Sequence, residues 1–362
     1  MRTGKLAPFG WGRLGLLSIV IVVISPSTRA AAVEVARYPR VAANVAVEVS
    51  ADGNVVGYGI CDPESKALRC SVRVREFRTG HFRQRTHFVI NGSSSPPSFQ
   101  FDATGRRLVV GTVRRGVTGV TIFDTKLRTA RFIRGFTLAG STGDRLLSAS
   151  GRYLLAYRIL NRKVGRIDLS NATFRLFPRI PGRQNVRPRG LSANGQLALY
   201  DGPNFADVSK FYLWSSNTGR AQFIGTSRQG PTGFSDNGSV VVFSALYRSK
   251  LSANPLQASI TRRDLLTGQL TPLDNLSADF AVTGDGDKIV SVCGKGLVVY
   301  SFLQKMYARL PGTVDAGFTR FIVASGGSRV IVHNSKMRRI QAVDLDAVVP
   351  VAGLPENCLK PV

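Results

Sequence analysis

The chain has 362 residues, with 49 lysines and arginines against 22 aspartates and glutamates, which gives a formal net charge of +27. Hydrophobic residues make up 43% of it, which excludes a chain too polar to build a sizeable core, and the length alone suggests two domains. The excess of arginine favours a polyanionic ligand or surface, and a compositional bias without such a partner is the alternative.

The first 32 residues have the layout of a secretory signal peptide. Residues 1–13 carry three cations and no acid, and an apolar run follows at residues 14–25. Small residues at positions 30–32 supply an A-x-A cleavage signal, so we expect cleavage near Ala32 and a secreted or periplasmic protein. The apolar run is shorter than the roughly 18 residues that span a bilayer, which disfavours an uncleaved anchor. No transmembrane segment is expected after cleavage.

A repeated turn sets the layout of the rest of the chain. Seven glycines each lie in a short turn before an apolar, strand-like run: Gly53, Gly105, Gly151, Gly195, Gly238, Gly286 and Gly327. They are separated by 52, 46, 44, 43, 48 and 41 residues, the period of propeller blades with four strands each. Glycine suits turns that need a positive φ. We therefore predict an all-β fold, a seven-bladed β-propeller of four-stranded antiparallel blades.

Because a closed ring of repeats forms one domain, this repeat replaces the expectation of two domains from length. A single propeller is predicted over residues 33–362. We expect its blades at residues 41–91, 98–135, 138–180, 186–226, 231–274, 278–311 and 316–355. The basic lead-in at residues 33–40 is expected to add an edge strand to the last blade and so close the ring, because an open edge invites aggregation. The seventh blade is expected to end on a strand at residues 348–351.

Four cysteines in an exported chain suggest two disulfides, with three possible connectivities. Cys61 and Cys70 bracket a turn-like loop, so we expect them to face each other across a hairpin. That leaves Cys293 and Cys358, whose bond would tie the C-terminus to a neighbouring blade. Free buried thiols are the alternative.

Short motifs within the repeat resemble a known family. The pattern Ser-x-Asp/Asn-Gly, an apolar strand, then an aspartate–leucine pair and Thr-Gly, as at residues 264–268, resembles the propeller repeat of TolB and similar exported WD-repeat-like proteins. The resemblance covers residues 41–355 and implies a type of repeat rather than a particular protein. Alanine stands at Ala51, Ala149 and Ala193 where the TolB repeat has proline, and no separate domain is expected ahead of the propeller.

Residues that support catalysis or metal binding are scarce. The three histidines, His81, His87 and His333, lack metal-ligand spacing, and no Gly-x-Ser-x-Gly elbow occurs. We expect no cofactor, no metal and no catalytic residue, hence a protein that binds rather than catalyses. The alternative is a lactonase- or lyase-like, metal-assisted enzyme with its site at the central channel. It would need converging polar residues there, whereas the inner strands are apolar except for Glu48 and Arg320.

Basic residues gather on one predicted rim of the propeller, where the loops between second and third strands meet the connections between blades. The candidate binding residues are Arg114, Arg115, Arg162, Lys163, Arg183, Arg187, Arg189, Lys210, Arg248, Lys250, Arg338 and Arg339. Further cations on this rim are Arg179, Arg228, Lys295 and Lys336, against the seven acids Asp62, Glu64, Asp201, Asp207, Asp274, Asp279 and Asp315.

Rigid blades would hold these loops so that their field adds across the ring. We therefore expect a protein partner or an anionic envelope or polysaccharide partner. A nucleic acid is not expected, because the chain is exported and lacks exposed aromatic residues interleaved with the cations. A structural module whose charge is incidental is a further alternative.

Overall fold

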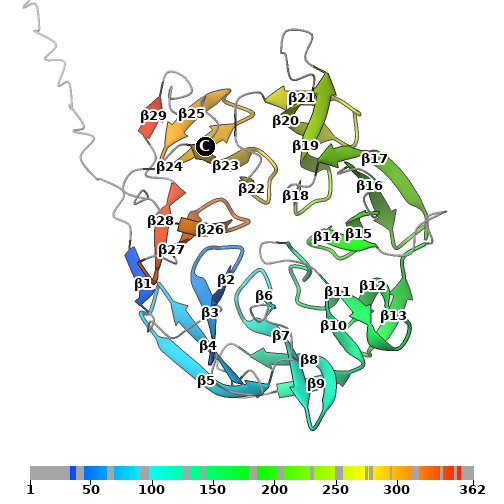
Figure 1. Ribbon diagram of the computed structural model, residues 1–362, viewed down its shortest axis with the longest axis vertical. Helices are drawn as coiled ribbons and strands as arrows, with labels where there is room; N and C mark the ends of the chain where they lie inside the picture. Colours follow the sequence, from blue (N-terminus) through cyan, green and yellow to red (C-terminus); the bar gives the residue numbers. More distant parts are fainter. Residues whose placement is uncertain are drawn as a thin grey trace, which may run out of the picture.

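In a computed structural model the chain forms a ring of seven blades around a central axis (Figure 1). The structure describes residues 33–37, 45–62, 69–89, 98–124, 127, 130–139, 144–178, 186–202, 208–228, 232–248, 256–273, 276, 280–293, 296–310, 318–334, 337–345 and 349–351. Each blade is built on four antiparallel strands, with its first strand nearest the axis, and the sixth blade carries a fifth strand at its outer edge (Figure 1). The predicted seven-bladed, all-β propeller is confirmed.

The first four blades follow one another in chain order. Their strands are β2 Val45–Val49, β3 Val55–Asp62, β4 Arg69–Glu76 and β5 Phe82–Val89; β6 Phe99–Phe101, β7 Arg107–Arg114, β8 Val117–Asp124 and β9 Ala130–Arg134; β10 Phe136–Leu138, β11 Tyr153–Arg158, β12 Lys163–Asp168 and β13 Thr173–Leu176; and β14 Arg187–Leu191, β15 Leu197–Asp201, β16 Val208–Ser215 and β17 Ala221–Arg228. A single register pair, Val89 with Val113, joins the sheets of the first two blades.

The last three blades complete the ring. Their strands are β18 Thr232–Phe234, β19 Val240–Arg248, β20 Leu256–Asp264 and β21 Leu270–Leu273; β22 Phe280–Val282, β23 Lys288–Cys293, β24 Gly296–Ser301 and β25 Met306–Arg309; and β26 Phe318–Val323, β27 Arg329–Asn334, β28 Arg339–Asp344 and β1 Val33–Arg37. The lead-in strand β1 pairs antiparallel with β28, as predicted, so the two ends of the chain close the ring within one blade.

One strand lies elsewhere than predicted. The segment expected to end the seventh blade, β29 (Val349–Val351), pairs instead with β25 and forms a fifth strand of the sixth blade. The reason is that β1 already occupies the outer edge of β28, and an edge can accept only one partner strand. The C-terminal segment therefore covers the edge of the neighbouring blade.

The apolar cores lie between neighbouring blades. Between the first two, Val72 and Val74 of β4 belong to the same buried cluster as Phe99, Phe101 and Leu108 of the second blade. Alternation along the strands supplies these residues, because side chains two apart lie on the same face of a sheet. Each blade thus buries its apolar faces against its two neighbours.

The seven repeated glycines all adopt a positive φ, between +64° and +75°, as predicted. The structure adds a second reason for glycine at these positions. A Cβ on Gly195 would lie 2.3 Å from the ring of Tyr153 in the preceding blade, and one on Gly105 would lie 2.6 Å from Val55. At these two turns the blades are therefore in close contact, and a Cβ would clash with the neighbouring blade.

The turns also form a closed ring of backbone hydrogen bonds around the axis. In each of the seven, a turn residue of one blade donates its N–H to a carbonyl in the next blade. The pairs are Ala51 to Ala103, Ala103 to Ala149, Ala149 to Ala193, Ala193 to Asp236, Asp236 to Gly284, Gly284 to Ser325, and Gly326 back to Ala51. This explains the alanines that replace proline in the repeat, because proline has no N–H to donate.

Arginines join the blades at three of the same turns. Arg166 donates to the carbonyl of Gly195, Arg262 to that of Gly286 (3.2 Å) and Arg329 to that of Gly53 (2.8 Å). Each guanidinium also lies over an aromatic ring, for example 4.2 Å from the ring centre of Tyr153 in the case of Arg166. Further arginines donate to backbone carbonyls across seams: Arg75, Arg131, Arg175 and Arg263. Part of the arginine excess is therefore structural.

Candidate functional site

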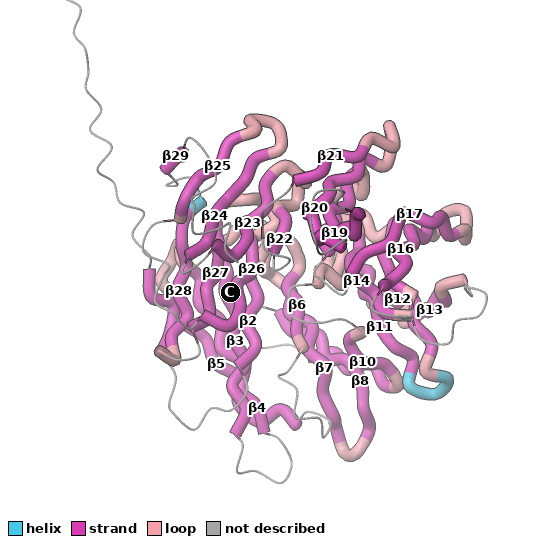
Figure 2. Tube along the Cα trace, turned by 45° about the horizontal axis from the view of Figure 1, so that its top comes forward, coloured by secondary structure: helices cyan, strands magenta, loops and turns pink. Residues whose placement is uncertain are grey.

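The basic loops and the glycine turns lie on opposite faces of the ring. In an antiparallel blade, the turn before the second strand and the hairpin after it lie at opposite ends of that strand. We call the two sides the turn face and the hairpin face. Figure 2 shows two tips of the hairpin face, the β7–β8 hairpin and the 3₁₀ turn η1 (Ile159–Asn161) between β11 and β12, projecting on the same side of the molecule.

Eight cations of blades two to four are exposed on the hairpin face. We call them the hairpin-face cations: Arg114, Arg115, Arg134, Arg158, Arg162, Lys163, Arg187 and Lys210. Arg114 lies over the ring of Phe132, 5.4 Å from its centre, and keeps its guanidinium at the surface. Every acid described in blades two to four is buried or half-buried. The described part of this face therefore presents charge of one sign to solvent.

Two of these cations, Arg134 and Arg158, were missed by the sequence analysis. They end strands β9 and β11, whereas the analysis considered loops alone. Backbone hydrogen bonds bring the strand ends to the hairpin: Gly135 donates to Thr118 (2.9 Å), and Ile159 donates to Gly135 (2.9 Å). The sequence signal that could have found them is an arginine at the end of a strand that returns to this face.

Arg189 was predicted to be a rim cation, and this is wrong. It lies on the inner strand β14, where its Nη2 is 2.7 Å from Oδ2 of Asp201. Both side chains are largely withdrawn from solvent, at 16% and 3% exposed. Burial raises the pKa of the Asp201 carboxyl, and the charge of Arg189 opposes that rise. Arg189 therefore neutralises a buried acid, whereas Arg187, two residues earlier, is exposed.

The remaining predicted residues differ in how far the structure describes them. Arg338 and Arg339 are half-buried at the β27–β28 hairpin, and Arg248 ends β19. Arg183 and Lys250 lie outside the described residues, as do Arg179, Lys295, Lys336 and Cys358. Cys61 lies directly opposite Cys70 in the β3–β4 register, as predicted for two residues that face each other across a hairpin.

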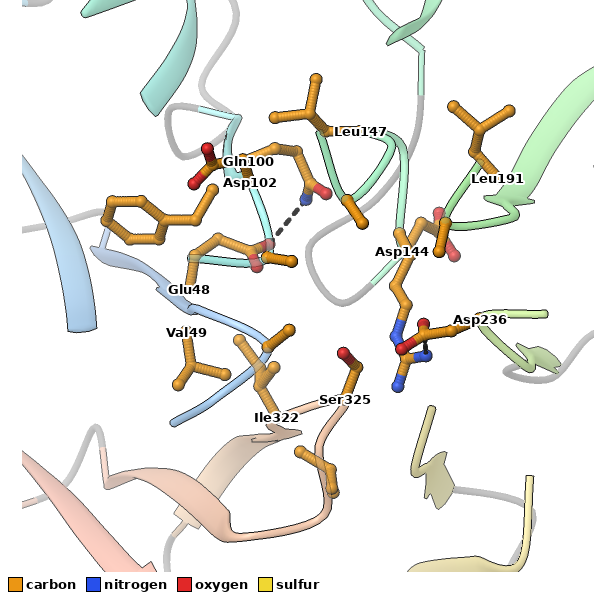
Figure 3. Close-up of a pocket in the computed structure, with 17 residues that line it drawn as sticks. Glu48, Val49, Gln100, Asp102, Asp144, Leu147, Leu191, Asp236, Ile322 and Ser325 are labelled. Carbon is orange, nitrogen blue, oxygen red and sulfur yellow. Dashed lines mark hydrogen bonds and ion pairs between the residues drawn. The ribbon is translucent and has the colours of Figure 1, made fainter. Parts of the chain in front are cut away.

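The central channel contains more polar residues than predicted. Besides Glu48, its lining includes Gln100, Asp144, Arg145 and Asp236 around a cavity of about 70 Å³ (Figure 3). The sequence analysis expected Glu48 and Arg320 as the only polar exceptions on the inner strands, which is wrong. The β10 strand ends at Leu138, and the chain returns to the channel at residues 144–147, so the inner strand of the third blade could not be read from one apolar run.

These channel groups are paired with one another. Gln100 donates to Glu48 (2.9 Å; Figure 3). It also accepts from the backbone N–H of Leu146 (3.0 Å). Arg145 reaches across from the third blade to the carboxylate of Asp236 (2.7 Å) in the fifth and the carbonyl of Val282 (2.7 Å) in the sixth. Burial lowers the pKa of Arg145, and Asp236 opposes that shift. These contacts therefore link five blades around the axis: the first, second, third, fifth and sixth.

Two further features bear on the class of site. Among the described residues, no group of three His, Cys, Asp or Glu side chains could hold a metal ion. Within the same residues, no helix is long and apolar enough to cross a bilayer. Glu48, Gln100, Arg145 and Asp236 in the channel are therefore hydrogen-bonded or ion-paired. The eight hairpin-face cations, by contrast, are exposed, and no acid described in blades two to four is exposed beside them.

Solved propellers share this fold. An oligogalacturonate lyase in complex with manganese aligns with a TM-score of 0.58 at 12% identity, over 87% of this chain and 90% of its own. Hydrazine synthase from Kuenenia stuttgartiensis aligns with a TM-score of 0.56 at 12% identity, over 84% and 96%. A chain of the mitotic checkpoint complex aligns with a TM-score of 0.55 at 14% identity, over 95% and 98%. At such identities the likeness shows the fold alone.

No family model matches the chain, and no curated protein matches its sequence. Structures of TolB from Acinetobacter baumannii and of the Cps50 (Swd1) beta-propeller domain from Myceliophteria thermophila are also among the solved structures that match, with TM-scores of 0.42 and 0.49.

Proposed function

We propose that this protein is an exported β-propeller that binds an anionic partner through its hairpin face. The observation that carries the proposal is the one-signed charge of the described hairpin face in blades two to four. Guanidinium groups bind phosphate, carboxylate and sulfate well, because their planar N–H donors match those oxygens in pairs. A partner that displays many such groups, on an acidic protein or an envelope polymer, fits this surface.

The rigid blades support this role. Tight hairpins hold the cations: Arg115 and Arg162 adopt φ values of +48° and +52°, which places each in a sharp turn between paired strands. Cations fixed on a rigid scaffold add their fields at one place, and no exposed acid described in these blades cancels them. Arginines that donate to carbonyls at the seams do not contribute to this surface.

The proposal is tested with two quadruple variants that lose the same charge from opposite faces. The first replaces Arg114, Arg115, Arg162 and Lys163 of the hairpin face by glutamine. The matched control replaces Arg78, Arg106, Arg220 and Lys305, which are exposed on the turn face. We expect the first variant to bind heparin roughly tenfold or more weakly, with a flatter salt dependence, because several near-surface cations act together.

The control is expected to retain binding close to that of the unaltered protein, because acids lie among the turn-face cations. Equal weakening of both variants would show that net charge, rather than this face, determines binding. Unchanged heparin binding by the hairpin-face variant would overturn the proposal. Thermal unfolding of both variants reports whether either substitution set disturbs the fold.

Export and a hairpin disulfide are further parts of this proposal. The signal-like residues 1–32 lie outside the described residues, and the first strand of the ring starts at Val33, next to the expected cleavage site. A Cys61–Cys70 bond is supported by the cross-strand register and suits an oxidising compartment. Mass measurement of the exported chain tests cleavage of the signal peptide. A peptide map without reduction tests the Cys61–Cys70 bond. An uncleaved N-terminus or a free Cys70 thiol would contradict this part.

A further inference from the structure

We propose that the tips of blades two and three dock on an anionic lipid surface, with Leu160 entering the headgroup region and the surrounding arginines contacting lipid phosphates. The proposal rests on the proposed function and names the partner class for the same face. It starts from apolar side chains that the binding of a polyanion leaves unexplained.

Three apolar side chains are exposed among the hairpin-face cations of these two blades. Leu160, in the turn η1, is 86% exposed, Ile159 beside it is 42% exposed, and Val117 at the β7–β8 hairpin is 45% exposed. Large apolar side chains exposed at the tips of neighbouring loops are typical of surfaces that meet another apolar phase. Because these side chains are exposed, they contribute little to the packing of the folded chain.

The two tips form one continuous surface. The β7–β8 hairpin is connected to Gly135 by the Gly135-to-Thr118 hydrogen bond, and Gly135 is connected to η1 by the Ile159-to-Gly135 hydrogen bond. Both tips project on the same side of the ring (Figure 2). Register pairs place Arg134 opposite Gly119 and Arg158 opposite Phe136, so both arginines lie between the tips.

Charge surrounds the apolar residues on this surface. Six of the hairpin-face cations belong to it: Arg114, Arg115, Arg134, Arg158, Arg162 and Lys163. No acid occurs in residues 114–119, 134–139 or 157–163. Peripheral membrane binding combines these same two contributions, apolar side chains buried at the headgroup boundary and cations attracted to anionic lipid. A soluble polyanion would use the cations and leave Leu160 in water.

The turn face provides a matched comparison. Leu266, in the turn between β20 and β21, is also 86% exposed, but Asp264 lies two residues before it and no cation occurs in residues 264–270. The Asp264 carboxylate accepts hydrogen bonds from the backbone N–H groups of Leu266 and Thr267 in that turn. Arg262 and Arg263, which precede this turn, are half-buried and donate to backbone carbonyls of neighbouring blades. Leu266 therefore lacks the exposed cations that surround Leu160.

The test measures sedimentation of the purified protein with vesicles of equal parts phosphatidylcholine and phosphatidylglycerol, beside vesicles of phosphatidylcholine alone. Leu160→Ser is expected to weaken binding to the anionic vesicles about tenfold, because it removes the apolar contribution of one buried leucine. Leu266→Ser is the control and is expected to leave vesicle binding unchanged. Heparin binding, measured in parallel, is expected to be unaffected by either serine substitution.

The outcomes separate this inference from the proposed function. Binding to heparin together with no binding to anionic vesicles would overturn the lipid inference and leave the anionic-partner proposal standing. Vesicle binding that is insensitive to Leu160→Ser, or equal for both vesicle types, would also overturn it. Unchanged heparin binding by the hairpin-face quadruple variant, together with Leu160-dependent binding to neutral vesicles, would overturn both. If the partner is instead a soluble acidic protein, the propeller would bind that protein in a Leu160-dependent way and would not bind vesicles. That result would contradict the inference.

Discussion

The two faces of this propeller use the same residue types in different ways. On the turn face, Ser50 and Ser192 accept backbone N–H groups five residues later (2.9 Å each), and arginines from preceding blades cap the turn carbonyls. Acids are frequent there and lie among the exposed cations. On the hairpin face of blades two to four, the described exposed charges are all positive, and their side chains donate to no described residue.

This difference shows that a count of arginines is a poor guide to a binding surface. Arg166 and Arg162 lie four residues apart, yet one joins two blades and the other is exposed in a turn. The difference is that Arg166 lies within hydrogen-bond distance of a backbone carbonyl in the next blade. That contact depends on how two blades pack together and cannot be seen in the sequence. The arginines of the turn face therefore hold the blades together, and the hairpin face is the one that we propose for partner binding.

The largest expected effect is on the turn face. Gly195→Ala would place a Cβ 2.3 Å from the Tyr153 ring at a φ of +72°, whereas Gly219→Ala has a φ of +69° and no atom within 4 Å. We expect about 1 kcal/mol of destabilisation for Gly219→Ala from the backbone alone, and about 1–3 kcal/mol more for Gly195→Ala from the clash. Urea unfolding of the two variants measures the difference. Equal losses would show that the glycine is required by its φ and not by the seam.

The ring of backbone hydrogen bonds is the next test of the turn face. Ala193→Pro removes the N–H that donates to Asp236 (2.6 Å), and Ala193→Ser keeps it. We expect Ala193→Pro to lower the free energy of unfolding by about 1–3 kcal/mol, because the carbonyl of Asp236 loses its partner. The serine variant is expected to remain close to the unaltered protein. Unchanged stability of the proline variant would contradict the claim that this ring of hydrogen bonds stabilises the fold.

A smaller effect is expected from pH. Burial raises the pKa of Asp168, but hydrogen bonds from Arg152 and Ser170 outweigh it and lower the pKa from 3.8 to about 2. A lowered pKa in the folded state means that stability is present above pH 4 and is lost as the pH falls toward 2, by about 1 kcal/mol after solvent screening. Urea midpoints across this range, compared with Asp168→Asn, measure the loss. An identical pH profile for both proteins would contradict the assignment.

The sequence could predict the fold because the repeat is local. Each glycine turn is followed directly in the chain by its strand, so the period of the glycines counts the blades. The sequence could not show which edge β29 would join, because the apolar pattern of a strand does not specify its pairing partner. Nor could it separate Arg189 from Arg187, since the ion pair with Asp201 forms only when β14 and β15 are side by side. The binding site therefore stays a prediction, and the structure changes which residues belong to it: Arg189 leaves the set, and Arg134 and Arg158 join it.

The most direct test of the division between faces compares Arg166→Gln with Arg162→Gln, each measured for stability and for heparin binding. We predict that Arg166→Gln lowers the free energy of unfolding by about 2 kcal/mol, through the lost carbonyl hydrogen bond and the lost contact with Tyr153, and that the folded variant keeps its heparin affinity. We predict the reverse for Arg162→Gln, unchanged stability and weaker binding. Equal losses of binding in both variants, or no loss of stability in Arg166→Gln, would contradict the account.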